Sequence, residues 1–156
     1  MAQTLYALSG APASVSTAQL DPNVLQFSSV PLSSANILAM NGAPVSILAA
    51  PGAGKAIVVD AVLFEFLVGG TQYASGGAVN FQYHGGSATG VFGAVTIAAA
   101  SVNGAASFNQ YLQPIGQATG QAITANTGVD ITNATGAFTT GTGTAIVKIW
   151  YSIVTL

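Results

Sequence analysis

Apolar residues in this chain recur in short runs that end at glycine, and this pattern constrains the fold more than any other feature. Ile57–Val68 is rich in β-branched and aromatic residues, is apolar at odd and even positions alike, and stops at Gly69 and Gly70. Such a run is typical of a strand buried on both faces. Nowhere do apolar positions hold a helical period for the roughly ten residues that a helix needs. The chain is therefore predicted to be all-β.

Other segments fit the same fold class. Val79–Tyr83 alternates apolar with polar residues, as in a half-exposed strand, and Thr144–Val154 is the most amphipathic strand of the chain. Weaker strands are predicted at Val91–Ile97, Ser107–Leu112, Gln121–Ala125 and Val129–Asn133. Short strands separated by glycine and asparagine turns predict an antiparallel β-sandwich or jelly roll.

Residues 1–50 differ from the rest in composition, being rich in serine, alanine and spaced prolines. Proline at this spacing disfavours long helices and favours extended or turn structure. We expect an extended N-terminal arm here, with first strands of the sandwich in its second half as the alternative, followed by a β-sandwich domain over 51–156. The apolar residues that such an arm would offer to a partner are Leu5, Tyr6, Leu8, Val24, Leu25 and Phe27.

The scarcity of charge limits what the protein can bind. Only 4% of residues are charged against 51% hydrophobic, and the net charge is −2, whereas an average globular chain has about 25% charged residues. No basic patch is present to contact nucleic acid phosphates or an anionic membrane surface. Because an apolar, weakly charged surface tends to associate, we expect protein partners, including further copies of this chain, and neither nucleic acid nor membrane.

Residues that could support catalysis are few. The chain has no cysteine and one histidine, His84. A catalytic histidine needs a nucleophile and an orienting acid, and a metal site needs several ligands. With four carboxylates scattered along the chain, neither set is expected. We predict a surface or interface histidine, no enzymatic activity, no cofactor and no metal.

Three local patterns have a functional alternative. Pro51–Lys55 resembles a phosphate loop but lacks its first glycine and its Ser or Thr, so a glycine turn is expected. Asp60 and Glu65 have opposite parity in one strand and face apart unless a bulge intervenes, which argues against a carboxylate pair. A Ca²⁺ site is conceivable around Asp130, with Asn126 and Asn133 nearby in sequence, although EF-hand spacing is absent.

Two stretches are similar to a known family. Pro44–Asp60, PVSILAAPGAGKAIVVD, and Tyr73–Tyr83, YASGGAVNFQY, resemble small structural proteins encoded among the head genes of tailed bacteriophages, and look like capsid decoration (cement) proteins. The resemblance covers residues 40–156. It implies a β-sandwich or jelly roll, often a homotrimer seated where capsomers meet, with an N-terminal arm reaching over the major capsid protein.

The function that this resemblance implies is structural. The protein would be a virion protein on the capsid exterior that binds and stabilises the assembled shell, with the major capsid protein and its own copies as partners. The alternative is a trimeric fibre knob or receptor-binding module of a phage. In that case exposed aromatic residues on loops, such as Tyr73, Phe92 or Tyr111, would stack on glycans.

Overall fold

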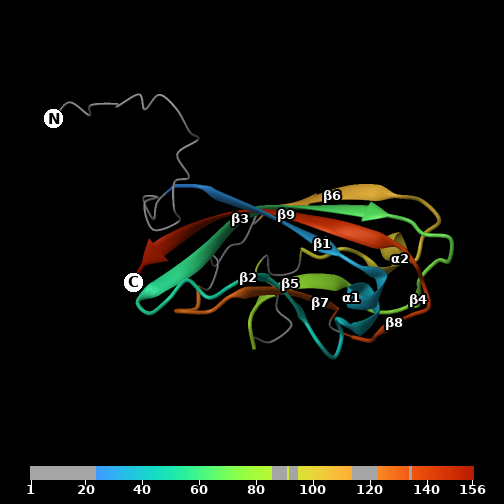
Figure 1. Ribbon diagram of the computed structural model, residues 1–156, viewed down its shortest axis with the longest axis horizontal. Helices are drawn as coiled ribbons and strands as arrows, with labels where there is room; N and C mark the ends of the chain where they lie inside the picture. Colours follow the sequence, from blue (N-terminus) through green and yellow to red (C-terminus); the bar gives the residue numbers. More distant parts are fainter. Residues whose placement is uncertain (1–23, 86–90, 92–94, 114–122, 134) are drawn as a thin grey trace, which may run out of the picture.

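The computed structural model describes residues 24–85, 91, 95–113, 123–133 and 135–156, which form two antiparallel sheets packed as a sandwich (Figure 1). Its elements, in chain order, are β1 (Gln26–Leu32), α1 (Ser34–Ala39), β2 (Val45–Leu48), β3 (Lys55–Leu67), β4 (Ala74–Ser75), β5 (Val79–Tyr83), α2 (Ala99–Val102), β6 (Phe108–Leu112), β7 (Val129–Asn133), β8 (Phe138–Thr139) and β9 (Thr144–Thr155). The predicted all-β sandwich is confirmed, whereas the jelly-roll connectivity stays a prediction.

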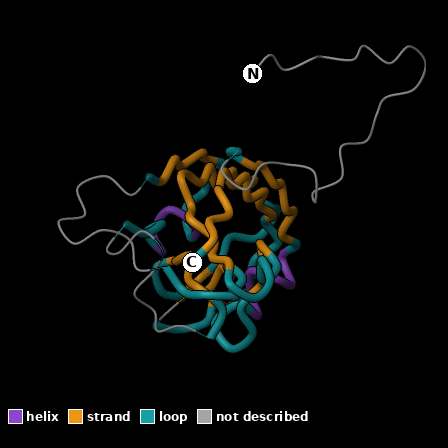
Figure 2. The backbone as a smooth tube through the Cα atoms, turned by 90° about the vertical axis from the view of Figure 1, so that its left-hand side faces the viewer, coloured by secondary structure: helices purple, strands orange, loops and turns teal. Residues whose placement is uncertain are grey.

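Long antiparallel pairing holds the larger sheet together. Its strand order is β1-β9-β3-β6, and β3 pairs with β9 from Lys55↔Thr155 to Leu67↔Thr144. The smaller sheet has the order β2-β7-β5, and the short β4-β8 pair lies at the same end of the sandwich as α1 and α2 (Figure 1). In an end-on view the short helical segments flank the strands (Figure 2). Neither helix in the described part of the chain has the length and apolar character needed to cross a membrane.

The second half of segment 1–50 belongs to the sandwich. β1 pairs antiparallel with β9, and β2 pairs antiparallel with β7. Between them, Ser33 caps the N-terminus of α1. Its hydroxyl oxygen accepts from the Asn36 backbone N–H, and its own backbone N–H donates to Asn36 Oδ1. Residues 26–48 therefore contain first strands of the sandwich, which is the alternative to an extended arm. Residues 1–23 lie outside the described residues.

β3 changes its inward-facing side part-way along. Ile57 and Val59 are buried before a register shift, and Phe64 and Phe66 are buried after it. The residue inserted at the shift is Asp60, a β-bulge that places two residues of β3 opposite one of β9. The expectation of a strand buried on both faces is met only in part, by Ala56 and Ala61, which are buried on the outer side. Apolar residues otherwise occupy both parities because the bulge switches the inner face from odd to even positions.

The smaller sheet is more buried than its sequence pattern suggests. Val79–Tyr83 was expected to have one exposed face, yet Asn80 is only 5% and Gln82 only 7% exposed. Other parts of the chain cover this face; for example, the Met40 carbonyl after α1 accepts a hydrogen bond from Thr132 on β7. Alternation reports which residues share a face, but not what packs against that face.

Two of the weaker predicted strands are confirmed, as β6 and β7. The other two, Val91–Ile97 and Gln121–Ala125, fall partly outside the described residues. In their described parts, Ile97 and Ala125 form only isolated bridges, to Val79 and Ala56 respectively. An isolated bridge pairs one residue instead of a run, so neither segment is a strand where the structure describes it.

Candidate functional site

The outer face of the larger sheet, the side turned away from β2-β7-β5, has a row of aromatic side chains. The Phe27 and Trp150 rings, which are register partners on β1 and β9, lie 5.3 Å apart between centroids. Trp150 also contacts Tyr111 on β6, with the ring centroids 6.3 Å apart and nearly edge to face. Between them on β3 lies Ala61, whose small side chain leaves room for the indole ring. This aromatic row therefore crosses the sheet from one edge strand to the other.

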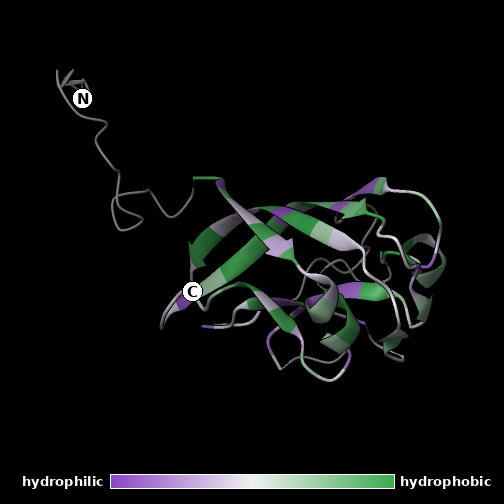
Figure 3. Ribbon diagram, turned by 45° about the vertical axis from the view of Figure 1, so that its right-hand side comes forward, coloured by the Kyte–Doolittle hydropathy of each residue, from purple (hydrophilic) through white to green (hydrophobic). Residues whose placement is uncertain are grey.

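Further apolar side chains extend this exposed surface. Leu67 is 64% and Ile146 is 40% exposed. Both line a shallow pocket of about 310 Å³ at the far end of β3 and β9. Hydrophobic and hydrophilic positions alternate in short steps along these strands, because each strand buries one face and exposes the other (Figure 3). Exposed apolar residues gathered on one face of a sheet are a feature of interaction surfaces.

The charged groups on the outer face are engaged within the chain. Lys148 Nζ lies 2.8 Å from Glu65 Oε1, and the Ser152 hydroxyl donates to Asp60 Oδ2 at 3.0 Å. The bulge does place Asp60 and Glu65 on one face, but about 16 Å of strand separates them. They form no carboxylate pair, and the outer face presents apolar surface with its charges already partnered.

The structure describes half of the predicted partner-interface residues. Val24, Leu25 and Phe27 are 44%, 56% and 54% exposed, so all three are available for contact. Leu5, Tyr6 and Leu8 lie outside the described residues. Trp150 is not among the residues predicted for this interface. Its alternation with Val147 and Ile149 in the last strand is the signal that could have placed it on the exposed side.

The aromatic residues proposed for glycan stacking do not share one loop cluster. Tyr73 is buried, at 3% exposure, and its hydroxyl donates to the Gly143 carbonyl at 2.8 Å. Its assignment as an exposed loop aromatic is therefore wrong, since it packs edge to face against Phe138 inside the core. Tyr111 is exposed but lies within β6, and Phe92 lies outside the described residues.

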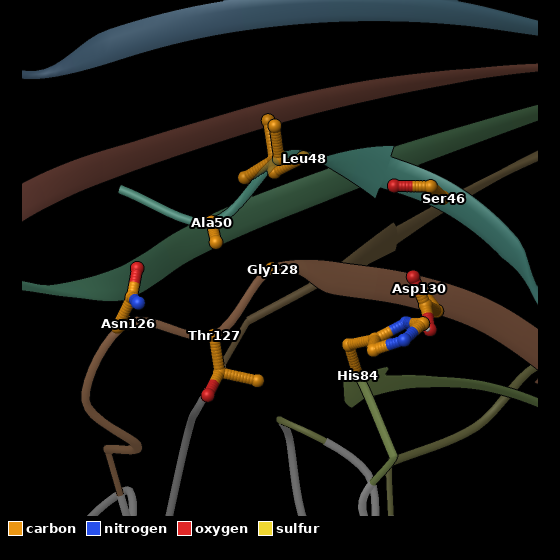
Figure 4. Close-up of a pocket in the computed structure, with 9 residues that line it drawn as sticks. Ser46, Leu48, Ala50, His84, Asn126, Thr127, Gly128 and Asp130 are labelled. Carbon is orange, nitrogen blue, oxygen red and sulfur yellow. Dashed lines mark hydrogen bonds and ion pairs between the residues drawn. The ribbon is translucent and has the colours of Figure 1, made fainter. Parts of the chain in front are cut away.

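A second site forms around His84, at the end of the smaller sheet (Figure 4). Its Nδ1 lies 2.7 Å from Oδ2 of Asp130, and the side chain of His84 is 76% exposed while that of Asp130 is 2% exposed. An ionised carboxylate can only accept, so Nδ1 is the donor in this hydrogen bond when Asp130 is ionised. Asp130 is an acid beside His84 that the sequence does not predict, since four carboxylates are scattered along the chain. The two residues lie 46 positions apart, and only strand pairing brings them together.

A pocket of about 290 Å³ adjoins this pair. Leu48, Ala49 and Ala50 form one wall, and Asn126 and Thr127 lie on another (Figure 4). Ser46 lines the same pocket, yet no hydrogen bond joins its hydroxyl to His84 in the described part of the chain. Among the described residues, His84 therefore has an acid partner and no hydrogen-bonded nucleophile, the two groups with which a histidine base acts in covalent catalysis.

The glycine segment beside this pocket is a turn, as predicted. The Lys55 N–H donates to the Gly52 carbonyl at 3.3 Å, and a strand, not a helix, follows. Asn126 holds the turn in place, because its Oδ1 accepts from the Gly52 N–H at 3.0 Å and its own N–H donates to the Lys55 carbonyl. The segment has no helix N-terminus to bind phosphate.

The three residues considered for Ca²⁺ do not converge. Asn126 is committed to the glycine turn, and Asn133 donates to the Gly136 carbonyl at 2.6 Å. Asn133 also has the opposite parity to Asp130 along β7, so the two side chains leave the strand on opposite faces. Within the described residues, no group of three or more His, Cys, Asp or Glu side chains is placed to hold a metal ion.

Comparison with known proteins identifies no relative from which a function could be inferred for this site. No protein-family model, no curated protein and no solved structure matches the chain.

Proposed function

We propose that the protein is a structural virion protein, a capsid decoration (cement) protein that binds the exterior of an assembled shell and stabilises it. The observation that supports this most strongly is the aromatic row of Phe27, Trp150 and Tyr111 on the outer face. Aromatic anchors dominate the binding energy of protein interfaces. The partners we propose are the major capsid protein and further copies of this chain, as a homotrimer.

The charge arrangement supports a protein partner. A face that docks on another protein must lose its water, and an unpaired charge there would oppose binding. On the outer face Lys148 and Glu65 already form an ion pair, so little charge has to be desolvated alone. Apolar and aromatic surface can then contribute to binding without a large desolvation cost from unpaired charges.

Stabilisation of a shell follows from differential binding. A ligand that binds the assembled state better than loose subunits shifts the equilibrium toward assembly by mass action. Many copies bound on one shell act multivalently and strengthen this effect. Such a role requires contact surface and no catalysis, and we accordingly propose that the protein is not an enzyme.

The test is binding to empty shells of the phage that encodes the chain, measured by co-sedimentation and by the melting temperature of the shells. The native protein should bind and raise that temperature. Trp150→Ser should weaken binding by at least about tenfold, since a central aromatic anchor contributes about 2 kcal/mol or more. The matched control is Ile123→Ser, which removes an exposed apolar side chain outside the aromatic row and should bind normally.

Two outcomes would contradict the proposal: no shell binding by the native protein, or equal binding by Trp150→Ser and Ile123→Ser. Circular dichroism of both variants establishes that they are folded. Without that control, loss of binding by Trp150→Ser could reflect loss of the sheet itself.

One observation favours a second candidate, the glycan-binding module. Tyr111 has a polar neighbour, Gln113, whose Nε2 lies 3.5 Å from the tyrosine hydroxyl, and the Lys148–Glu65 pair lies on the same face. Aromatic rings flanked by polar groups can stack on sugars and bind their hydroxyls. Binding to host surface glycans, with no affinity for shells, would favour this candidate over a cement protein.

A further inference from the structure

A row of oxygen-bearing side chains crosses the smaller sheet, one from each strand. Asp130 on β7 is the register partner of Ser46 on β2 and also of Gln82 on β5. Directly paired residues share a face, with Cβ atoms about 4.5–5.5 Å apart. The three side chains, which we call the polar row, therefore extend from the same side of the sheet.

Only one of the two oxygens of the carboxylate at the centre of the polar row has a hydrogen-bond partner. Oδ2 of Asp130 contacts His84, but Oδ1 is buried and has no hydrogen-bond partner, in a side chain that is 2% exposed. A buried charged oxygen without a partner is costly, and such a group in a folded protein calls for a ligand such as an ion or water. The hydroxyl of Ser46 and the amide of Gln82 also make no hydrogen bond within the described residues, so both are free to act as ligands.

We propose that the polar row binds a hard cation, with Ca²⁺ as the matching ion. Carboxylate, amide and hydroxyl oxygens are the ligands that Ca²⁺ takes, and Asp130 Oδ1, Gln82 Oε1 and Ser46 Oγ supply one of each. The pocket of about 290 Å³, which Ser46 and Asp130 line, has room for the waters that would complete the coordination. His84, by holding Oδ2, fixes the orientation of the carboxylate.

This site differs from the Ca²⁺ site considered from the sequence. That site drew on neighbours of Asp130 along the chain, whereas the polar row draws on its neighbours across the sheet. It lies on the smaller sheet and not on the outer face, so the cation and the shell interaction are independent. With one carboxylate, the affinity should be in the weak range of about 10⁻⁴–10⁻³ M.

The test is calorimetric titration of the chelator-treated full chain with CaCl2, together with thermal melting with and without the ion. The native protein should show one saturable site and a melting temperature that rises with Ca²⁺ concentration. Asp130→Asn should lose at least about tenfold in affinity, because it removes the anionic ligand. The matched control is Asp60→Asn, which makes the same change in charge on the outer face and should bind Ca²⁺ normally.

A second variant keeps the test decisive if Asp130→Asn does not fold. Ser46→Asp adds a carboxylate to the polar row at an exposed position while keeping the His84–Asp130 pair, and it should tighten Ca²⁺ binding by about tenfold or more. The proposal is overturned if the native protein shows no saturable binding up to about 10 mM Ca²⁺, well above the expected range. It is equally overturned if Ser46→Asp binds no more tightly than the native protein.

Discussion

Two tyrosine hydroxyls in the sandwich show how burial controls chemistry at single residues. Tyr73 donates to the Gly143 carbonyl and Tyr83 donates to the Ile57 carbonyl at 2.6 Å. Burial raises the pKa of Tyr73 to about 12 and the pKa of Tyr83 to about 12, because the phenolate would lose its water. Both side chains therefore stabilise the fold in their neutral, donating form.

This predicts a loss of stability at alkaline pH. A pKa that is higher in the folded state than in the unfolded chain means that folding favours the protonated form. The contribution is complete below about pH 10, the unfolded value, and is lost as pH rises toward about 12. Denaturant unfolding at a series of pH values should show the free energy of unfolding falling in this window.

The replacement Tyr83→Phe should remove part of that alkaline slope, because its hydroxyl no longer titrates. In a spectrophotometric titration the native protein should ionise its last tyrosines near pH 12, and Tyr83→Phe should lose part of this late component. If all tyrosine absorbance changes near pH 10, the burial of these hydroxyls is contradicted. The pH at which these tyrosines ionise therefore measures how completely the core buries their hydroxyls.

At the scale of elements, the bulge at Asp60 lets β3 hold one extra residue while its apolar side chains keep facing the core. Pairing runs through Val59↔Tyr151 and then Ala61↔Trp150, so Asp60 has no partner of its own on β9. Without that residue the two strands would pair regularly, and every side chain of β3 would keep its present face. The bulge is therefore an insertion that the sheet accommodates, and its charged side chain stays exposed.

This predicts that deletion of Asp60 is tolerated, whereas deletion of Leu63 in the same strand is not. Loss of Asp60 removes the hydrogen bond from Ser152, at a cost below about 2 kcal/mol. Deleting Leu63 would turn either Phe64 and Phe66 or the preceding half of the strand toward water. Thermal melting of the two variants checks this, and equal destabilisation by both deletions would contradict the register.

At the scale of the whole molecule, scarce charge and an apolar outer face make self-association an apolar process. The ion pair of Lys148 and Glu65 is internal to the chain, and the same face exposes Phe27, Leu67, Tyr111 and Ile146. Salt weakens contacts between exposed charges but not between apolar groups. The oligomer we propose should therefore be insensitive to ionic strength.

Light scattering of the purified protein at low and high NaCl concentration measures this. We expect the same oligomeric mass at both, and a decrease in mass for Trp150→Ser if the aromatic row forms the contact between copies. A monomer at micromolar concentration, or an oligomer that dissociates in high salt, would contradict apolar self-association. The result bears on the contact between copies and is separate from shell binding.

Much of the fold could be predicted because strand signals are local. The all-β class and strands such as Ile57–Val68 and Thr144–Val154 follow from the period of apolar residues and from the glycines that end each run. Exposure of Val24, Leu25 and Phe27 was also anticipated. The sequence signal for the bulge is the opposite parity of Asp60 and Glu65, since two charged residues of one strand can share its exposed face only if a residue is inserted between them.

The candidate sites could be predicted only in part, because they depend on which strands become neighbours. The amino-acid sequence by itself determined the all-β class, the scarcity of charge and the near absence of catalytic groups. Only the tertiary structure decided that Asp130 lies beside His84, that Gln82 is buried, and that three aromatic rings align across β1, β9 and β6. The physical reason is that the period of a strand shows which residues share a face, whereas pairing between distant strands decides what those residues meet.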